Sequence, residues 1–167
     1  MTEWLSQEEQ RSWRAWLSAS RLLNEQLSKE LAEKHGLTIA DYVILVQLSE
    51  SPDHQVRMSD LAEQTLSSRS RLSHQIDRME KRGLVRREAC SDDRRGYFAI
   101  LTDAGLQAIV EAAPDHVAGV RTHLVDLLGP ANFAALGNAC ARVTDHLESM
   151  HLESMHLDSI DSKGECD

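Results

Sequence analysis

The sequence predicts a mainly α-helical protein with a small β-hairpin, and three observations carry this prediction. Long segments with helical periodicity occupy both ends of the 167-residue chain, which contains only three prolines. A short capped helix and a second, cation-rich helix are predicted between them. Two short strand-like segments, 84–89 and 97–101, then enclose a charged loop.

The first element is a long helix over residues 8–34. Its apolar side chains recur at helical spacing, and Gly36 follows at the position where a left-handed cap is favoured. Thr38 caps a second helix with Asp41 three residues later, a capping-box arrangement, and Ser51-Pro52 ends it. The apolar face of the first helix consists of Trp13, Trp16, Leu17, Leu23, Leu27 and Leu31.

The middle of the chain has the plan of a helix-turn-helix. A short helix is predicted from Asp60 to about Thr65, and Ser67 or Ser68 caps another that runs to Arg82 and stops at Gly83. The two predicted strands then form a hairpin wing around Cys90–Gly96. The fold class is therefore a winged helix-turn-helix module flanked by N- and C-terminal dimerisation helices.

The C-terminal part predicts further helices and a tail. A helix from Asp103 to about Leu128 should be kinked by Pro114, and Gly129-Pro130 stops and restarts it. The next helix has a heptad seam, which requires a partner helix. The tail repeats HLESM with a period of five, which matches neither helix nor strand, and is predicted to be disordered. The seam residues are Phe133, Leu136, Cys140, Val143 and Leu147.

These elements divide the chain into four parts. Residues 1–36 form an N-terminal dimerisation helix, 37–102 the winged module, 103–147 the C-terminal dimerisation helices and 148–167 the acidic repeat tail. Together they predict a homodimer, because each apolar stripe needs cover that a single small chain only partly provides.

Charge and cysteine usage narrow the class of protein. The net charge is −9, yet residues 57–95 carry ten Lys/Arg against seven Asp/Glu, a local balance of +3 on an acidic chain. The three cysteines are widely spaced, and neither a signal peptide nor an apolar run of membrane-spanning length is evident, so we expect a cytoplasmic protein without membrane contact. The absence of a phosphate loop, of HExxH and of a Cys/His cluster argues against an enzyme, a metal site or a cofactor.

The second helix of the helix-turn-helix is suited to the major groove of double-stranded DNA. Small polar and cationic side chains line its outer face, while Leu72, Ile76 and Met79 face inward. In the wing, an arginine at the hairpin tip can enter the minor groove while an adjacent aspartate limits its rotamers. The predicted DNA-binding residues are Ser68, Arg69, Ser70, Arg71, Ser73, His74, Gln75, Arg78, Asp93, Arg94 and Arg95, with His74 and Gln75 expected at base edges.

These motifs resemble the MarR family (multiple antibiotic resistance regulators). The matching residues are Met79-Glu80, Gly83-Leu84-Val85, Asp93-Arg94-Arg95, Thr102 and Gly105, and the architectural likeness covers residues 8–147. On the second helix of the helix-turn-helix, the recognition helix, this chain has His74 where many members have a small residue or an arginine. The resemblance implies a homodimeric transcriptional regulator, most often a repressor, that binds a pseudo-palindrome and releases it when a small aromatic or acidic ligand binds.

A candidate ligand pocket and two alternative functions accompany this interpretation. A ligand pocket could be lined by Trp13, Trp16 and Tyr42 with His35 or Arg57 as a nearby cation, although core packing is the default role of the aromatic residues. Cys90, expected to be exposed at the wing, could make the protein a redox-responsive repressor. The module could also have kept its fold for protein interactions without an operator of its own.

Overall fold

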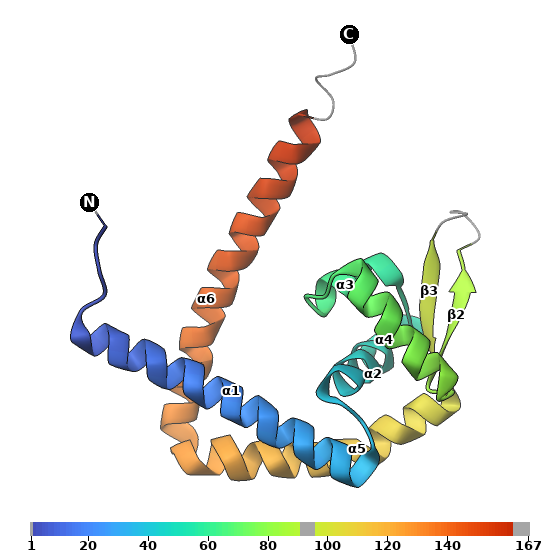
Figure 1. Ribbon diagram of the computed structural model, residues 1–167, viewed down its shortest axis with the longest axis horizontal. Helices are drawn as coiled ribbons and strands as arrows, with labels where there is room; N and C mark the ends of the chain where they lie inside the picture. The colour runs from blue at the N-terminus through green and yellow to red at the C-terminus, as the bar shows by residue number, and fades with distance from the viewer. Residues whose placement is uncertain (1, 91–95, 162–167) are drawn as a thin grey trace. The chain divides into compact units, whose positions relative to one another are not determined.

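A computed structural model of the protein describes residues 2–90 and 96–161, with side chains up to residue 150. Its winged module consists of three helices and a three-stranded sheet. Figure 1 shows α3, α4 and the β2–β3 hairpin grouped together. The predicted fold class is confirmed. The elements are α1 (Gln7–His35), α2 (Ile39–Glu50), η1 (Pro52–His54), β1 (Gln55–Arg57), α3 (Met58–Gln64), α4 (Arg69–Lys81), β2 (Val85–Ala89), β3 (Tyr97–Leu101), α5 (Asp103–Val120), η2 (Arg121–Val125) and α6 (Asp126–Asp161).

Local capping explains where the first two helices begin and end. Gly36 ends α1 in the left-handed conformation, at φ 62°, which glycine adopts without a steric cost. Thr38 begins α2, and the backbone N–H of Asp41 donates to its hydroxyl while the Asp41 carboxylate accepts from the Thr38 N–H. The predicted caps of both helices are confirmed.

The sheet has the order β1-β3-β2, with all neighbours antiparallel. β2 and β3 form the predicted hairpin, with Val85 opposite Leu101 and Ala89 opposite Tyr97. β1 pairs its three residues with the other edge of β3, so that Val56 faces Ala99. The sequence analysis did not predict β1, because three residues are too few to show alternation.

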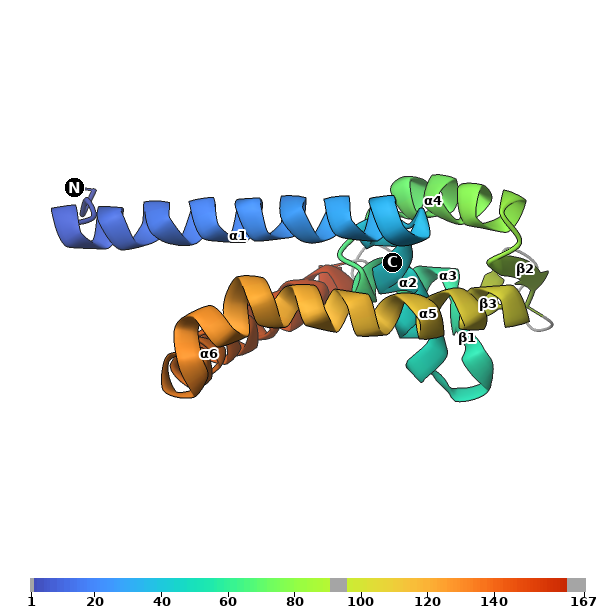
Figure 2. The same cartoon turned by 90° about the horizontal axis from the view of Figure 1, so that it is seen from below.

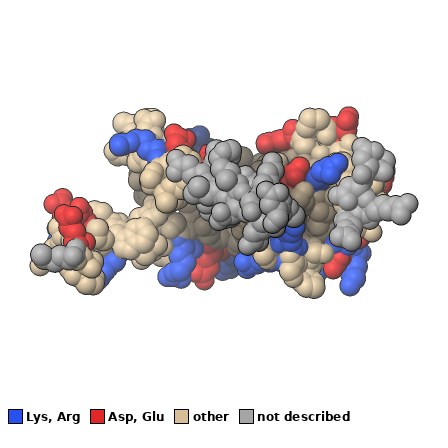
Figure 3. All heavy atoms as spheres, turned by 90° about the horizontal axis from the view of Figure 1, so that it is seen from above, with Lys and Arg blue, Asp and Glu red and all other residues tan. Residues whose placement is uncertain are grey.

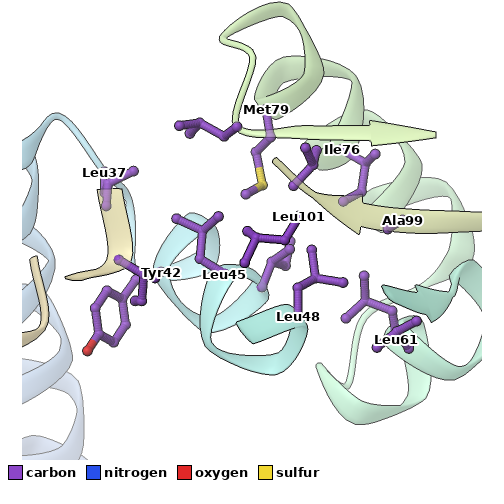
Figure 4. Close-up of a cluster of buried hydrophobic side chains, with 14 of the residues drawn as sticks. Leu37, Tyr42, Leu45, Leu48, Leu61, Ile76, Met79, Ala99 and Leu101 are labelled. Carbon is purple, nitrogen blue, oxygen red and sulfur yellow. The ribbon is translucent and has the colours of Figure 1, made fainter. Parts of the chain in front are cut away.

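One apolar core holds the module together and fixes the orientation of α4. Side chains of α2, α3, α4 and the sheet meet at its centre, while Tyr42 points away from this centre (Figure 4). α1 and α5 add Leu31, Ile109 and Ala112 to the same core. Because the inner face of α4 packs against this core, its opposite face is the one that solvent reaches. The residues at the centre include Leu45, Leu48, Leu61, Ile76, Met79, Ala99 and Leu101.

The chain separates into two compact units, residues 1–120 and 121–167. α5 belongs to the first unit and runs through Pro114, and it lies beside α1 in both ribbon views (Figures 1 and 2). In the second unit Gly129 interrupts α6 with φ 71° and ψ 165°, which confirms the predicted stop and restart. No described helix has both the length and the apolar character needed to span a membrane.

The tail differs from the sequence-based expectation of disorder. α6 continues to Asp161 and so includes most of the HLESM repeat. A period of five prevents a continuous apolar stripe, but Leu, Met and Glu favour helix individually, and extending an existing helix avoids the cost of nucleation. Residues 162–167 lie outside the described residues.

The junction of α1, α2 and α5 contains two titratable rings. Tyr42 of α2 and His116 of α5 stack with ring centroids 4.4 Å apart and planes tilted by 42°. The Nδ1 atom of His116 is buried and has no hydrogen-bond partner among the described residues. Burial therefore lowers the pKa of His116 from its ordinary value, against a smaller opposing effect of the Glu30 carboxylate.

This lowered pKa predicts a pH-dependent stability. The unfolded chain binds a proton at His116 near pH 6.5, whereas the folded chain resists it, so the His116 contribution is complete above pH 6.5 and is lost as the pH falls below it. We expect His116→Phe, which keeps a ring against Tyr42, to lose less unfolding free energy than the parent between about pH 7.5 and about pH 5.5. Urea titrations at both pH values measure this; identical losses in both proteins would contradict it.

Candidate DNA-binding interface

The candidate interface is the outer face of α4. Ser68 caps the helix by accepting a hydrogen bond from the Arg71 backbone N–H at 3.3 Å. The buried side chains Leu72, Ile76 and Met79 anchor the helix to the core, as predicted. Because residues three and four apart share one helical face, the exposed side chains form a polar and cationic strip. The exposed residues of α4 and its cap include Ser68, Arg69, Ser70, Arg71, His74, Arg78 and Lys81, and Ser73 is half-buried.

Gln75 departs from the expectation that it reads base edges. Only 8% of it is exposed, and its amide donates to the Asp41 carboxylate on α2. Its spacing of three residues from Leu72 and four from Met79 places it on the inner face of the helix. A side chain committed to a buried carboxylate cannot extend into a DNA groove, so Gln75 is removed from the candidate interface.

Arg87 of β2 ties the recognition helix to the hairpin. Its guanidinium donates to the Ser73 carbonyl at 2.8 Å and lies 2.5 Å from Asp77 and 3.3 Å from Glu80. Its backbone N–H also donates to the Glu80 carboxylate at 2.9 Å. The hydrogen bond from Arg87 lowers the pKa of Asp77. Arg87 therefore serves the position of α4, a role that the sequence analysis did not assign.

The wing is described only at its base. Asp93, Arg94 and Arg95 lie outside the described residues, so their predicted contacts stay predictions. At the base, the Cys90 backbone N–H donates to the Gly96 carbonyl at 2.9 Å. Cys90 is only 7% exposed, contrary to the exposed thiol that we expected. The redox-responsive alternative thereby loses the solvent access on which it depended.

Among the described residues on the face drawn in Figure 3, positive charge does not form one continuous field. On the face drawn in Figure 3, Lys and Arg side chains alternate with Asp and Glu. Several arginines are also paired within the fold: Arg86 lies 2.5 Å from Glu88, and Arg82 lies 3.2 Å from Asp41. The shape and polarity of α4 therefore indicate the interface more specifically than net charge does.

Comparison with known proteins agrees with this geometry. AbsC, a MarR family transcriptional regulator from Streptomyces coelicolor, is 52% identical in an alignment that covers 89% of this chain and 99% of AbsC, with a TM-score of 0.83. This chain belongs to the MarR family. The family model matches residues 35–96, which span most of the winged module.

Two further relatives extend the comparison. Sco3205, a MarR family regulator of the same organism solved in complex with DNA, is 42% identical over 88% of this chain and 92% of its own, with a TM-score of 0.84. The regulator MhqR of Bacillus subtilis is 28% identical over 102 residues, which are 61% of this chain and 68% of MhqR. As a member of this family, the chain is a DNA-binding transcriptional regulator and not an enzyme.

The five residues predicted to line a ligand pocket fall into separate places in this MarR-family chain. His35 and Tyr42 both contact α5, His35 through Asp115 at 2.9 Å and Tyr42 through the ring of His116. Trp16 precedes His35 by 19 residues on α1, a separation of about 28 Å along the helix axis, and Trp13 lies one turn farther away.

Arg57 lies in a third place, on β1, where its guanidinium carbon is 5.4 Å from the centroid of the Phe98 ring. It lines a surface hollow of about 660 Å³ together with Met58, Arg69 and Tyr97. Within one chain, the structure thus brings only His35 and Tyr42 to the same junction. A single pocket that also uses Trp13 and Trp16 would need a second chain.

Proposed function

We propose that the chain is a homodimeric repressor that inserts α4 into the major groove of a pseudo-palindromic operator. The observation that carries this proposal is the division of α4 into two faces, one packed on the core and one polar, cationic and exposed. Its capped N-terminus also presents the positive end of the helix dipole to phosphate. The proposed contacts are Ser68, Arg69, Ser70, Arg71, Ser73, His74 and Arg78, with Asp93, Arg94 and Arg95 from the wing.

Exposed apolar side chains support the dimer. Trp13 and Trp16 on α1 are 52% and 47% exposed, and Leu17 lies beside them at helical spacing. In the other unit, Val143 and Leu147 of the predicted seam are also exposed. Stripes of this kind on a soluble chain mark interaction surfaces, and two-fold symmetry would place the two α4 helices about 34 Å apart, one DNA turn.

The experiment that tests the function is selection of bound duplexes from a random-sequence pool, followed by footprinting. We expect enrichment of an inverted repeat whose half-site centres are about 10 base pairs apart. Enrichment of an asymmetric sequence would contradict the proposal that a two-fold symmetric dimer binds a pseudo-palindromic operator. Absence of any DNA binding at low salt would instead favour a module that serves protein interactions.

His74 is the residue for which we expect a base contact, because it is exposed near the middle of the outer face of α4. His74→Ala should relax the preference at one position in each half-site, at a cost of about 1–3 kcal/mol, and leave the salt dependence nearly unchanged. Competition binding against single-base variants of the selected duplex measures this.

The matched control for His74→Ala is Lys29→Ala, which removes an exposed side chain of α1 that pairs with Glu33. We expect the Lys29 variant to bind like the parent. A uniform loss across all sequences in the His74 variant, with a shallower salt slope, would assign His74 to phosphate instead.

Repression and release by a small aromatic or acidic effector form the remaining part of the proposal. The junction of His35 and Tyr42 is the part of the predicted pocket that one chain assembles. An effector bound at this junction would alter the packing of α1, α2 and α5 against one another. A panel of aromatic acids in gel-shift assays with the selected duplex tests release, and tryptophan fluorescence reports binding independently.

A further inference from the structure

We propose that Asp41 is a positioning residue for DNA recognition, which orients Arg78 through Gln75 and fixes the end of α4 through Arg82. The inference rests on the proposed function only in requiring that the outer face of α4 contacts DNA. Asp41 lies on α2, within the core side of the module, and touches no part of the candidate interface directly.

The first step is the burial of a carboxylate in the core. Asp41 is 3% exposed, and its Oδ2 atom accepts the Thr38 backbone N–H at 3.0 Å as part of the α2 capping box. A capping box does not itself require burial: Ser6 and Glu9 form the same arrangement at the start of α1, fully in solvent. A buried carboxylate is costly unless other donors satisfy it.

The second step is that α4 and its C-cap residue supply those donors. The amide of Gln75 donates to Oδ1 of Asp41, and the guanidinium of Arg82 donates to Oδ2 at 3.2 Å. Residues 75 and 82 are two helical turns apart and lie on the same face. Arg82 also donates to the Gly36 carbonyl at 3.0 Å, at the cap of α1. Asp41 thus connects the recognition helix to the junction between the first two helices.

The third step leads from the core to the interface. Because the NH₂ group of the Gln75 amide donates to the Asp41 carboxylate, its carbonyl oxygen turns the other way and accepts from the guanidinium of Arg78. Arg78 is exposed on the outer face of α4. The carboxylate thereby restricts the rotamers of a cation before DNA arrives, and an arginine ordered in advance loses less entropy on contact.

The test is a double-mutant cycle on operator affinity. Methionine at position 75 has a similar shape to glutamine, but it can neither donate to Asp41 nor accept from Arg78. Arg78→Ala removes the cation that Gln75 is proposed to orient. With the duplex selected from the random pool, we expect Gln75→Met to weaken binding about 3- to 10-fold when Arg78 is present and to have no further effect when it is absent. An equal loss in both backgrounds would mean that Gln75 serves only the packing of α4, and would overturn the proposal.

Asp41→Asn provides the second arm of the cycle, with Glu9→Gln as its control, since that change removes a carboxylate from the exposed capping box of α1. We expect Asp41→Asn to show the same coupling to Arg78, and Glu9→Gln to bind like the parent. Thermal unfolding of every variant establishes the folded fraction, and if Asp41→Asn does not fold, the Gln75 cycle alone decides.

Failure of the proposed function gives a different result from failure of this inference. If Arg71→Ala and Arg78→Ala both leave the affinity unchanged, α4 does not contact DNA. If Arg71→Ala weakens binding while Gln75 and Arg78 show no coupling, α4 is the interface and the positioning role of Asp41 is wrong.

Discussion

Replacement of Gly105 by alanine is expected to destabilise the winged module strongly. A Cβ atom at this position would lie 2.1 Å from the backbone oxygen of Leu84 and 2.7 Å from Cδ1 of Leu101, and the first of these neighbours cannot rotate away. The same Leu84 oxygen accepts hydrogen bonds from the Thr102 backbone N–H at 3.2 Å and the Thr102 hydroxyl at 2.9 Å. Relief of the clash would therefore disturb the connection between the hairpin and α5.

The expected cost is about 1–3 kcal/mol or slightly more, a fall in melting temperature on the order of 5–10 °C. Gly137→Ala is the matched control, because a Cβ added to this α6 glycine would meet no atom within 4 Å beyond its own stretch of helix, and alanine favours helix by up to about 1 kcal/mol. Calorimetry of both variants measures the difference. Equal melting temperatures for the two variants would show that the close approach of Gly105 to Leu84 is not what stabilises this corner.

The second large effect is expected from charging the apolar stripe of α1. Trp13→Asp combined with Trp16→Asp places two carboxylates where the proposed dimer buries two exposed indoles. We expect a monomer in sedimentation experiments and a loss of operator affinity of at least about 100-fold, because each chain then engages a single half-site without the effective concentration that its partner supplies.

Arg14→Asp is the control for this change, since Arg14 is an exposed residue of the same helix and its replacement changes the net charge by the same amount as the two tryptophan changes together. This control should remain a dimer if the indoles carry the interface. A tryptophan variant that stays dimeric would assign the dimer to other surfaces, and a monomer with parental affinity would contradict the coupling of assembly to DNA binding.

Most of the fold was predictable because its signals are local. Thr38 with Asp41, Gly36 and Ser68 specify helix ends within three or four residues of chain, and the structure places these caps as predicted. The inner face of α4 was also predictable from Leu72, Ile76 and Met79. Local propensity and apolar spacing suffice wherever a backbone group and its satisfying partner are neighbours in sequence.

The parts that could not be predicted depend on partners far apart in sequence. β1 exists because Gln55–Arg57 pairs with β3, and three residues carry no pattern of their own. Asp41 and Arg82 meet across 41 positions, so the capping box disclosed only half of the role of Asp41. For Gln75 a signal existed, because its spacing to Leu72 and Met79 places it on the inner face, but its polarity suggested the outer one.

The clamp of Arg87 on α4 has a consequence for how the two reading elements share binding energy. The contacts of Arg87 with Ser73, Asp77 and Glu80 span two turns of helix. They hold the hairpin and α4 in a fixed relative position, so the two elements act like the two binding groups of a bivalent ligand with a short, rigid linker. When α4 engages its groove, the proposed wing contact follows at a high effective concentration. Residue changes at either element should therefore alter affinity through both, and a weak wing contact can still matter for residence time on DNA.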